Sequence, residues 1–264
     1  MPENDLFDIK KRINAATQTS KITRTMELIA SSRLQRGKIL LANYLDWFNS
    51  MKDASKCLPD SYFESPENLQ AVKKKAYIIF GGGKGLSGAY SPNLLQYARP
   101  IVPGHDIIAV GSAAEAAFPD SYGFFPDDLP SLSYAKSIAR KALDLYESEE
   151  VQEVYMLYTK GLKHVSDKLF PLARPKEYDS AVIIEPPGQI FFPVLFEEYS
   201  ASVVYEAQLH AFISEQVARV TAMDSATKNA DDIVENLQAR YNRIRQSRIT
   251  QEIIELSNVA RGDG

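Results

Sequence analysis

The residues that could most obviously form a binding or reactive site are the glycines of residues 83–88. They fit the pattern G-x-G-x-x-G shortly after an apolar run that ends at Phe80. Between a strand and a helix, such a loop lets backbone amides approach a pyrophosphate. The acidic partner is missing, because Asp106 precedes the next expected strand. A phosphate-binding P-loop fails because Lys84 is followed by Gly85. The pattern therefore favours a tight turn, and a nucleotide-binding α/β enzyme that uses this loop remains the alternative.

The other reactive side chains are few and scattered. His105, His164 and His210 have no metal-ligand spacing, and the single Cys57 excludes a disulfide within the chain. No Ser/His/Asp arrangement stands out. We therefore expect no catalytic residue, no metal and no cofactor.

The two ends of the chain are expected to form long helices. Residues 201–260 contain neither proline nor glycine, which allows a rod of about 55 residues and about 80 Å. Its apolar positions recur in steps of three and four: Leu209, Ile213, Val220, Met223, Ala230, Val234, Leu237, Tyr241 and Ile244. Residues 1–56 keep a similar heptad-like register: Leu6, Ile9, Ile13, Ala16, Ser20, Thr23, Glu27, Ala30, Leu34, Gly37, Leu41, Tyr44, Phe48 and Met51. These patterns predict an antiparallel coiled coil that closes the chain on itself.

The middle of the chain, residues 57–200, alternates expected strands with expected helices. Strands are expected at 73–80, 106–111, 153–161 and 180–187, and residues 164–173 are expected to form a turn or irregular segment. This order predicts a mainly parallel sheet covered on both faces. The fold class is therefore α/β, with a Rossmann-like domain at 57–200 between coiled-coil helices at 1–56 and 201–264.

The apolar face of the last helix is interrupted after Ile244. Residues 245–248 are Arg-Gln-Ser-Arg, and an apolar stripe resumes on another face at Ile249, Ile253 and Leu256. We infer that the partner helix ends near this point. The tip would then continue alone into surroundings that offer acceptors to arginine and glutamine. A solvated tail explains the pattern equally well.

Two segments resemble one known family. Residues 214–256, with the core Y-N-x-x-R-Q-x-x-I-T-Q-E, and residues 9–36 are similar to the C-terminal and N-terminal helices of the gamma subunit of F-type ATP synthases. The resemblance implies a rotor shaft that transmits torque between the membrane ring of c subunits and the ring of alpha and beta subunits. It also implies contact with the epsilon subunit, one copy per complex, and catalytic sites on the beta subunits. A non-rotating coiled-coil scaffold remains a further alternative.

The resemblance also implies which residues contact the alpha/beta ring. Arg245 and Gln246 match the Arg-Gln pair that hydrogen-bonds acidic loops of the ring, Thr250 and Glu252 match its neighbours, and Met26 matches a methionine of the first helix that faces the same region.

The sequence departs from the family pattern in three places. Arg248 stands where a small residue is usual, residues 81–83 are Gly-Gly-Gly in place of a polar triplet, and Ser87 replaces a cysteine. The departure at Arg248, together with a central region that is shorter than usual in the family, leaves open whether the coupling ion is a proton or sodium. The departures at 81–83 and 87 leave open whether this loop contacts the surrounding subunits as it does in the family.

The totals limit the possible partners. The chain has 264 residues, 45% of them hydrophobic, and a net charge of −4, so nucleic acid is not an expected partner. The first residues are polar, and no apolar run approaches the roughly 18 residues of a membrane span. We expect a peripheral protein that reaches a membrane only through partners, on the cytoplasmic face of a bacterial or archaeal inner membrane.

Overall fold

The computed structural model describes residues 2–63, 74–83, 85–125, 129–148, 150–173 and 187–262. The chain divides into two compact units. Unit 1 comprises Met1–Ile29 and Val220–Gly264, and unit 2 comprises Ala30–Arg219. Two long helices contribute to both units: α1 (Pro2–Ala54) and α5 (Gly188–Gly262). The expected fold class, helical ends around an α/β domain, is confirmed.

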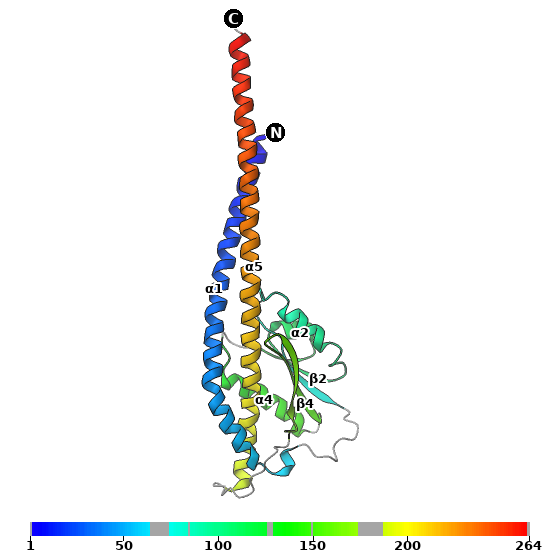
Figure 1. The fold of residues 1–264 in the computed structure, drawn as a ribbon. Coiled ribbons are helices and arrows are strands. Elements are labelled where there is room, and N and C mark those ends of the chain that lie inside the picture. Colours follow the sequence, from blue (N-terminus) through cyan, green and yellow to red (C-terminus); the bar gives the residue numbers. More distant parts are fainter. Residues whose placement is uncertain are drawn as a thin grey trace. The chain divides into compact units, whose positions relative to one another are not determined.

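Unit 1 is an antiparallel pair of helices. Ser20 Oγ of α1 donates to Asp231 Oδ1 of α5 at 2.6 Å, and Thr23 Oγ1 lies 2.7 Å from Thr227 Oγ1. Residue numbers rise along α1 while they fall along α5, so the two helices run in opposite directions. Figure 1 shows α5 continuing past the N-terminal end of α1.

The heptad-like register expected for the first helix is confirmed along its length. All fourteen of its positions, from Leu6 to Met51, are buried or half-buried, whereas most positions between them are exposed. The small residues in the middle of this face allow a close approach. Within unit 2, a Cβ atom added to Gly37 would lie 3.0 Å from Phe212 Cδ1 and 3.2 Å from Ile213 Cγ1 of α5.

Among its described residues, unit 2 forms a five-stranded sheet in the order β3-β2-β1-β4-β5. The strands are β1 (Lys75–Phe80), β2 (Asp106–Val110), β3 (Tyr122–Phe124), β4 (Glu153–Lys160) and β5 (Lys163–Phe170). β1 pairs in parallel with β2 and β4, β2 pairs in parallel with β3, and only β5 is antiparallel to its neighbour. The mainly parallel sheet is therefore confirmed.

Helices cover both faces of this sheet, as expected from alternating strands and helices. They are α2 (Tyr90–Ala98), α3 (Ser112–Ala117) and α4 (Leu132–Glu147), together with the part of α5 that belongs to unit 2. Ile78 faces the core formed with α4 and α5, whereas the next residue, Ile79, faces the core formed with α2 and α3. Two short 3₁₀ turns, Ser55–Cys57 and Asp60–Tyr62, follow α1.

Two sequence-based expectations about these elements are wrong. Residues 164–173 were expected to be a turn or irregular, yet most of them form β5, which folds back on β4 after Gly161 at φ +65°. The charged residues of β5 are compatible with a strand because an edge strand leaves much of its surface exposed. The last helix begins at Gly188 rather than at residue 201 and passes through Pro193. The strand expected at 180–187 lies outside the described residues, apart from its last position.

Candidate partner-binding surface

The end of α5 in unit 1 carries the residues expected to contact a partner. Extending the register of the Ser20–Asp231 and Thr23–Thr227 contacts puts Pro2, the first described residue of α1, opposite about residue 249 of α5. Arg245 and Gln246 therefore lie beside the N-terminal turn of α1, and both are exposed. The inference that the partner helix ends near this point is confirmed. The rest of α5 extends beyond it (Figure 1).

In the tip of α5, residues 245–262, some polar side chains already have partners within the helix. Arg248 Nε lies 2.9 Å from Glu252 Oε1, and Thr250 Oγ1 donates to the Gln246 carbonyl at 2.9 Å. Glu252 and Thr250 thus already have partners along the helix. The extra charge of Arg248 is met by a carboxylate one turn away, which the i,i+4 spacing in the sequence could have predicted.

The tip also carries exposed apolar side chains. Ile249, Ile253 and Ile254 are all exposed, and Ile253 is the most exposed of the three at 60%. Isoleucines gathered at one helix end next to arginine and glutamine are typical of a surface that binds another protein. The tip can therefore offer both apolar contact and charge-assisted hydrogen bonds.

Met26 lies on α1, away from this tip. Its side chain is 37% exposed, and Ile22 and Ile29 are exposed at the same three-to-four spacing on that helix. The register places Met26 opposite about residue 224 of α5, so it lies about 30 Å along the helix pair from Arg245. The structure therefore separates the five expected contact residues into two places. Ile22 and Ile29 were not expected at this surface, although their spacing is visible in the sequence.

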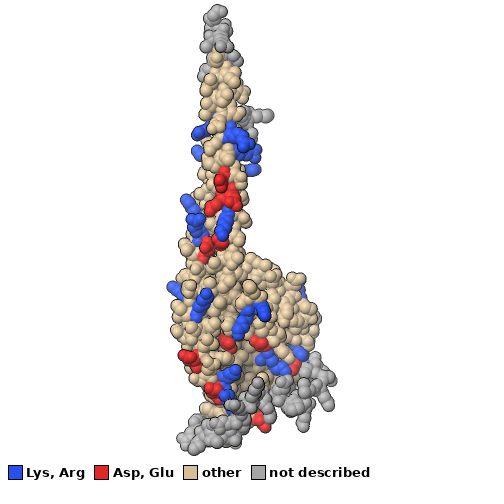
Figure 2. Space-filling view, viewed as in Figure 1, with Lys and Arg blue, Asp and Glu red and all other residues tan. Residues whose placement is uncertain are grey.

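Basic side chains gather near the tip end of unit 1. Lys10 and Arg12 of α1 lie across the pair from Arg240 and Arg243 of α5 by the same register, and all four are exposed. Figure 2 shows basic groups on the visible face of this stretch and acidic groups further from the tip. A partner with acidic loops would be attracted to such a band.

The glycine loop of unit 2 turns its carbonyl groups toward neighbouring helices. Gly82 O accepts from Ala113 N at 3.2 Å, and Gly83 O accepts from Ser112 Oγ at 2.7 Å. Gly85 O accepts from both Nε and Nη2 of Arg219, at 3.2 and 3.1 Å. A phosphate cradle would instead present amide groups. The geometry supports the expected tight turn and gives no support to the nucleotide-binding alternative.

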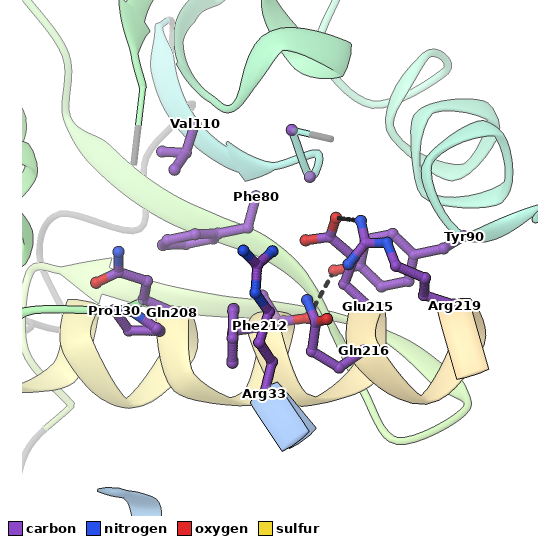
Figure 3. A pocket seen from close by; sticks show the side chains of 13 residues that line it. Arg33, Phe80, Tyr90, Val110, Pro130, Gln208, Phe212, Glu215, Gln216 and Arg219 are labelled. Carbon is purple, nitrogen blue, oxygen red and sulfur yellow. Dashed lines mark hydrogen bonds and ion pairs between the residues drawn. The ribbon is translucent and has the colours of Figure 1, made fainter. Parts of the chain in front are cut away.

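The space beside this loop is also small. A cavity of about 70 Å³ lies next to Gly82 and Gly83 (Figure 3), whereas drug-sized ligands occupy about 300–1,000 Å³. The small space gives the nucleotide-binding alternative no further support.

Other reactive groups of the described residues take part in local contacts. His210 Nε2 lies 3.5 Å from Glu206 Oε1, and His164 Nδ1 lies 3.1 Å from Thr159 Oγ1. Burial raises the pKa of Cys57, whose Sγ lies 2.8 Å from the Ala54 carbonyl oxygen. Among the described residues, no group of three or more His, Cys, Asp or Glu side chains is placed to hold a metal ion. Within the same residues, none of the helices combines the length and apolarity that crossing a bilayer requires.

Comparisons with known proteins agree over nearly the whole length. The family model described as ATP synthase matches residues 5–261. The chain is 32% identical to the ATP synthase gamma chain of Ruminiclostridium cellulolyticum, with 96% of this chain and 97% of the relative covered. It is 33% identical to the ATP synthase gamma chain of Alkaliphilus metalliredigens, with 94% and 95% covered.

Solved structures show a similar fold at low sequence identity. A chain of the Euglena gracilis mitochondrial ATP synthase, in a structure of OSCP, F1 and the c-ring, aligns with a TM-score of 0.73 at 16% identity and covers 98% of this chain and 95% of its own length. A chain of the Tetrahymena thermophila mitochondrial central stalk and c-ring aligns with a TM-score of 0.57 at 19% identity, covering 78% of this chain and 99% of its own. With its paired helices and its parallel sheet matched over this length, the chain belongs to the family of ATP synthase gamma chains.

Proposed function

We propose that this chain is the central-stalk subunit, the rotor shaft, of an F-type ATP synthase. In this role it transmits torque between a membrane ring of c subunits and a ring of alpha and beta subunits. The observation that carries the proposal is the exposed end of α5, where Arg245 and Gln246 lie beside the N-terminal turn of α1. The names of the curated relatives and the stalk structures with a similar fold support it.

The proposed coupling works through a surface that differs from one side of the shaft to the other. The side chains of Arg245 and Gln246 carry hydrogen-bond donors. Among the contacts of the described residues, Glu252 pairs with Arg248 and Thr250 with the Gln246 carbonyl, so neither of them takes up those donors. Each hydrogen bond to an acidic loop of the ring contributes about 1.5–3 kcal/mol. Rotation of the shaft moves these donors from one ring subunit to the next, so the ring subunits take up different conformations in turn. Met26 makes a second contact further along the shaft.

The remaining parts of the proposal concern the assembly. The catalytic sites belong to the beta subunits, and this chain is a non-catalytic subunit present in one copy and in contact with the epsilon subunit. It is peripheral and is held at the cytoplasmic face of a bacterial inner membrane through the c ring. The gamma chains to which it is similar come from bacteria, which supports this location.

The test is to assemble the chain with alpha, beta, epsilon and the membrane sector and to compare ATP hydrolysis with ATP-driven ion pumping. We expect Arg245→Ala to lower pumping about tenfold or more while hydrolysis falls much less, because loss of a charged hydrogen bond of about 1.5–3 kcal/mol weakens the grip on the ring. Arg36→Ala is the matched control, since Arg36 is an exposed arginine of α1 outside the basic band.

Two results would contradict the proposal. One is an equal loss of pumping in Arg36→Ala and Arg245→Ala, which would indicate a general effect of charge. The other is a bead attached to this chain that stays still during ATP hydrolysis by the assembled complex, which would favour a scaffold that does not rotate.

A further inference from the structure

The cavity beside the glycine loop lies where two parallel strands of unit 2 end. Phe80 and Val110, the last residues of β1 and β2, line it, and α5 lies across it with Gln208 and Gln216 (Figure 3). In open α/β sheets, the crevice outside the carboxyl ends of the strands is a common binding position. The volume of about 70 Å³ suits a very small occupant.

Two buried amide oxygens in this cavity have no hydrogen-bond partner among the described residues. They belong to Gln208, which is 5% exposed, and Gln216, which is 2% exposed. Buried polar atoms are almost always paired, because an unpaired one has given up its hydrogen bonds to bulk water without replacing them. Both oxygens are acceptors, so an occupant that satisfies them must carry O–H or N–H groups.

The charged side chains that line the cavity already have partners within the protein. Arg219 donates to Gly85 O and pairs with the Glu215 carboxylate. Arg33, which lines the cavity from α1, also takes part in an interaction of its own. Neutralising a charge is therefore no reason for a ligand to bind here. The groups that remain to be satisfied are the two neutral acceptors, and they call for a neutral donor.

We propose that this cavity is a binding site for two ordered water molecules, which bridge the side chains of Gln208 and Gln216 between α5 and the strand ends. Each water donates one hydrogen to a glutamine oxygen, and a further hydrogen bond joins the two waters. The cavity volume equals that of about two water molecules in the liquid. The two glutamines are about two turns apart on α5, or about 12 Å, so two long side chains and two waters in series can span the distance.

The first test counts the long-lived waters of the full chain by magnetic relaxation dispersion of water oxygen-17. The wild type is compared with a double variant, Gln208→Met with Gln216→Met, in which side chains of nearly the same size lack both amide oxygens. We expect the double variant to lose about two long-lived waters, because its cavity no longer offers the acceptors that hold them. Gln35→Met, at an exposed position of α1, is the matched control and should lose none.

The second test is a double-mutant cycle in urea unfolding, and its sign depends on the waters. With bridging waters, Gln208→Met or Gln216→Met alone should raise the unfolding equilibrium constant about fivefold, because each leaves the shared waters and the other glutamine short of a partner. The double variant should raise it no more than one single variant does, since nothing is then left unpaired. If the oxygens are unpaired in the native protein, each single change removes a destabilising group, and the effects add.

Two results would overturn the proposal. Equal numbers of long-lived waters in the wild type and the double variant would show that the glutamines hold none. Single variants at least as stable as the wild type, with additive effects in the double variant, would show that no water is shared between the two side chains.

Discussion

Substitution of Gly111 is expected to damage the sheet of unit 2 far more than substitution of another glycine with the same backbone preference. Gly111 follows β2 at φ +95°, and its amide donates to Phe124 O at 2.8 Å. A Cβ atom at this position would overlap the carbonyl oxygen of Gly82 and lie 2.8 Å from its carbonyl carbon. Gly82 cannot easily move away, because its oxygen accepts from Ala113 N. Gly111→Ala therefore combines backbone strain with a collision against backbone.

Gly104 separates these two effects. Its φ is +79°, and no described atom lies within 4 Å of the position that a Cβ atom would take. Gly104→Ala thus introduces backbone strain alone, which costs about 1–2 kcal/mol. Gly111→Ala adds a collision of the kind that costs about 1–3 kcal/mol in packed interiors. We expect the unfolding free energy of Gly111→Ala to be lower than that of Gly104→Ala by about 2 kcal/mol.

The assay is urea unfolding of the full chain, followed by far-UV circular dichroism, for the wild type and both variants. The m-values should agree among the three proteins, so that midpoints can be compared. A difference between Gly104→Ala and Gly111→Ala of less than about 0.5 kcal/mol would refute the reasoning, because that is the typical scatter of neutral surface substitutions. It would mean that the glycine loop yields to a side chain at this position.

Two further predictions concern polar contacts in the two units. In unit 2, burial raises the pKa of Glu153, but the ammonium groups of Lys168 and Lys75, at 2.7 and 2.9 Å, outweigh burial and lower that pKa. A lowered pKa in the folded state gives stability that is present above the unfolded pKa of about 4.3 and is lost as the pH falls. Glu153→Gln should therefore be less stable than the wild type in urea at pH 7, and this difference should shrink as the pH falls below about 4.3. In unit 1, Thr23→Val removes the contact with Thr227 and should cost about 1 kcal/mol, and Thr23→Val with Thr227→Val should cost less than the sum of the two single changes in a double-mutant cycle.

The long helices were predictable because their pattern repeats many times. Each of the positions from Leu6 to Met51 adds the same periodic signal, so that polar members such as Ser20 and Glu27 do not break it. The start of α5 was not predictable on the same basis, because Gly188 and Pro193 are usually read as helix stops. The helix tolerates Pro193, which lies close to its N-terminal end.

The edge strand β5 and the cavity could not be predicted from the sequence, for different reasons. β5 carries Lys163, Asp167 and Lys168, which resemble a turn when they are read alone, and only pairing with β4 makes the segment a strand. The cavity depends on long-range packing, since the amide oxygens of Gln208 and Gln216 lie buried without a hydrogen-bond partner among the described residues only where the sheet ends against α5. No local sequence pattern predicts this packing of the sheet against α5.

The turn after β1 shows that one glycine spacing is compatible with two opposite electrical polarities. A loop that points its amides outward attracts anions, whereas this one directs the carbonyl oxygen of Gly85 at the guanidinium of Arg219 and so holds a cation of its own chain. Searches that look for nucleotide sites by glycine spacing alone will therefore also select purely structural turns of this type, in which a carbonyl accepts from an arginine. Arg219 lies far from this loop in the sequence. The contact that distinguishes the two cases therefore becomes visible only in the folded chain.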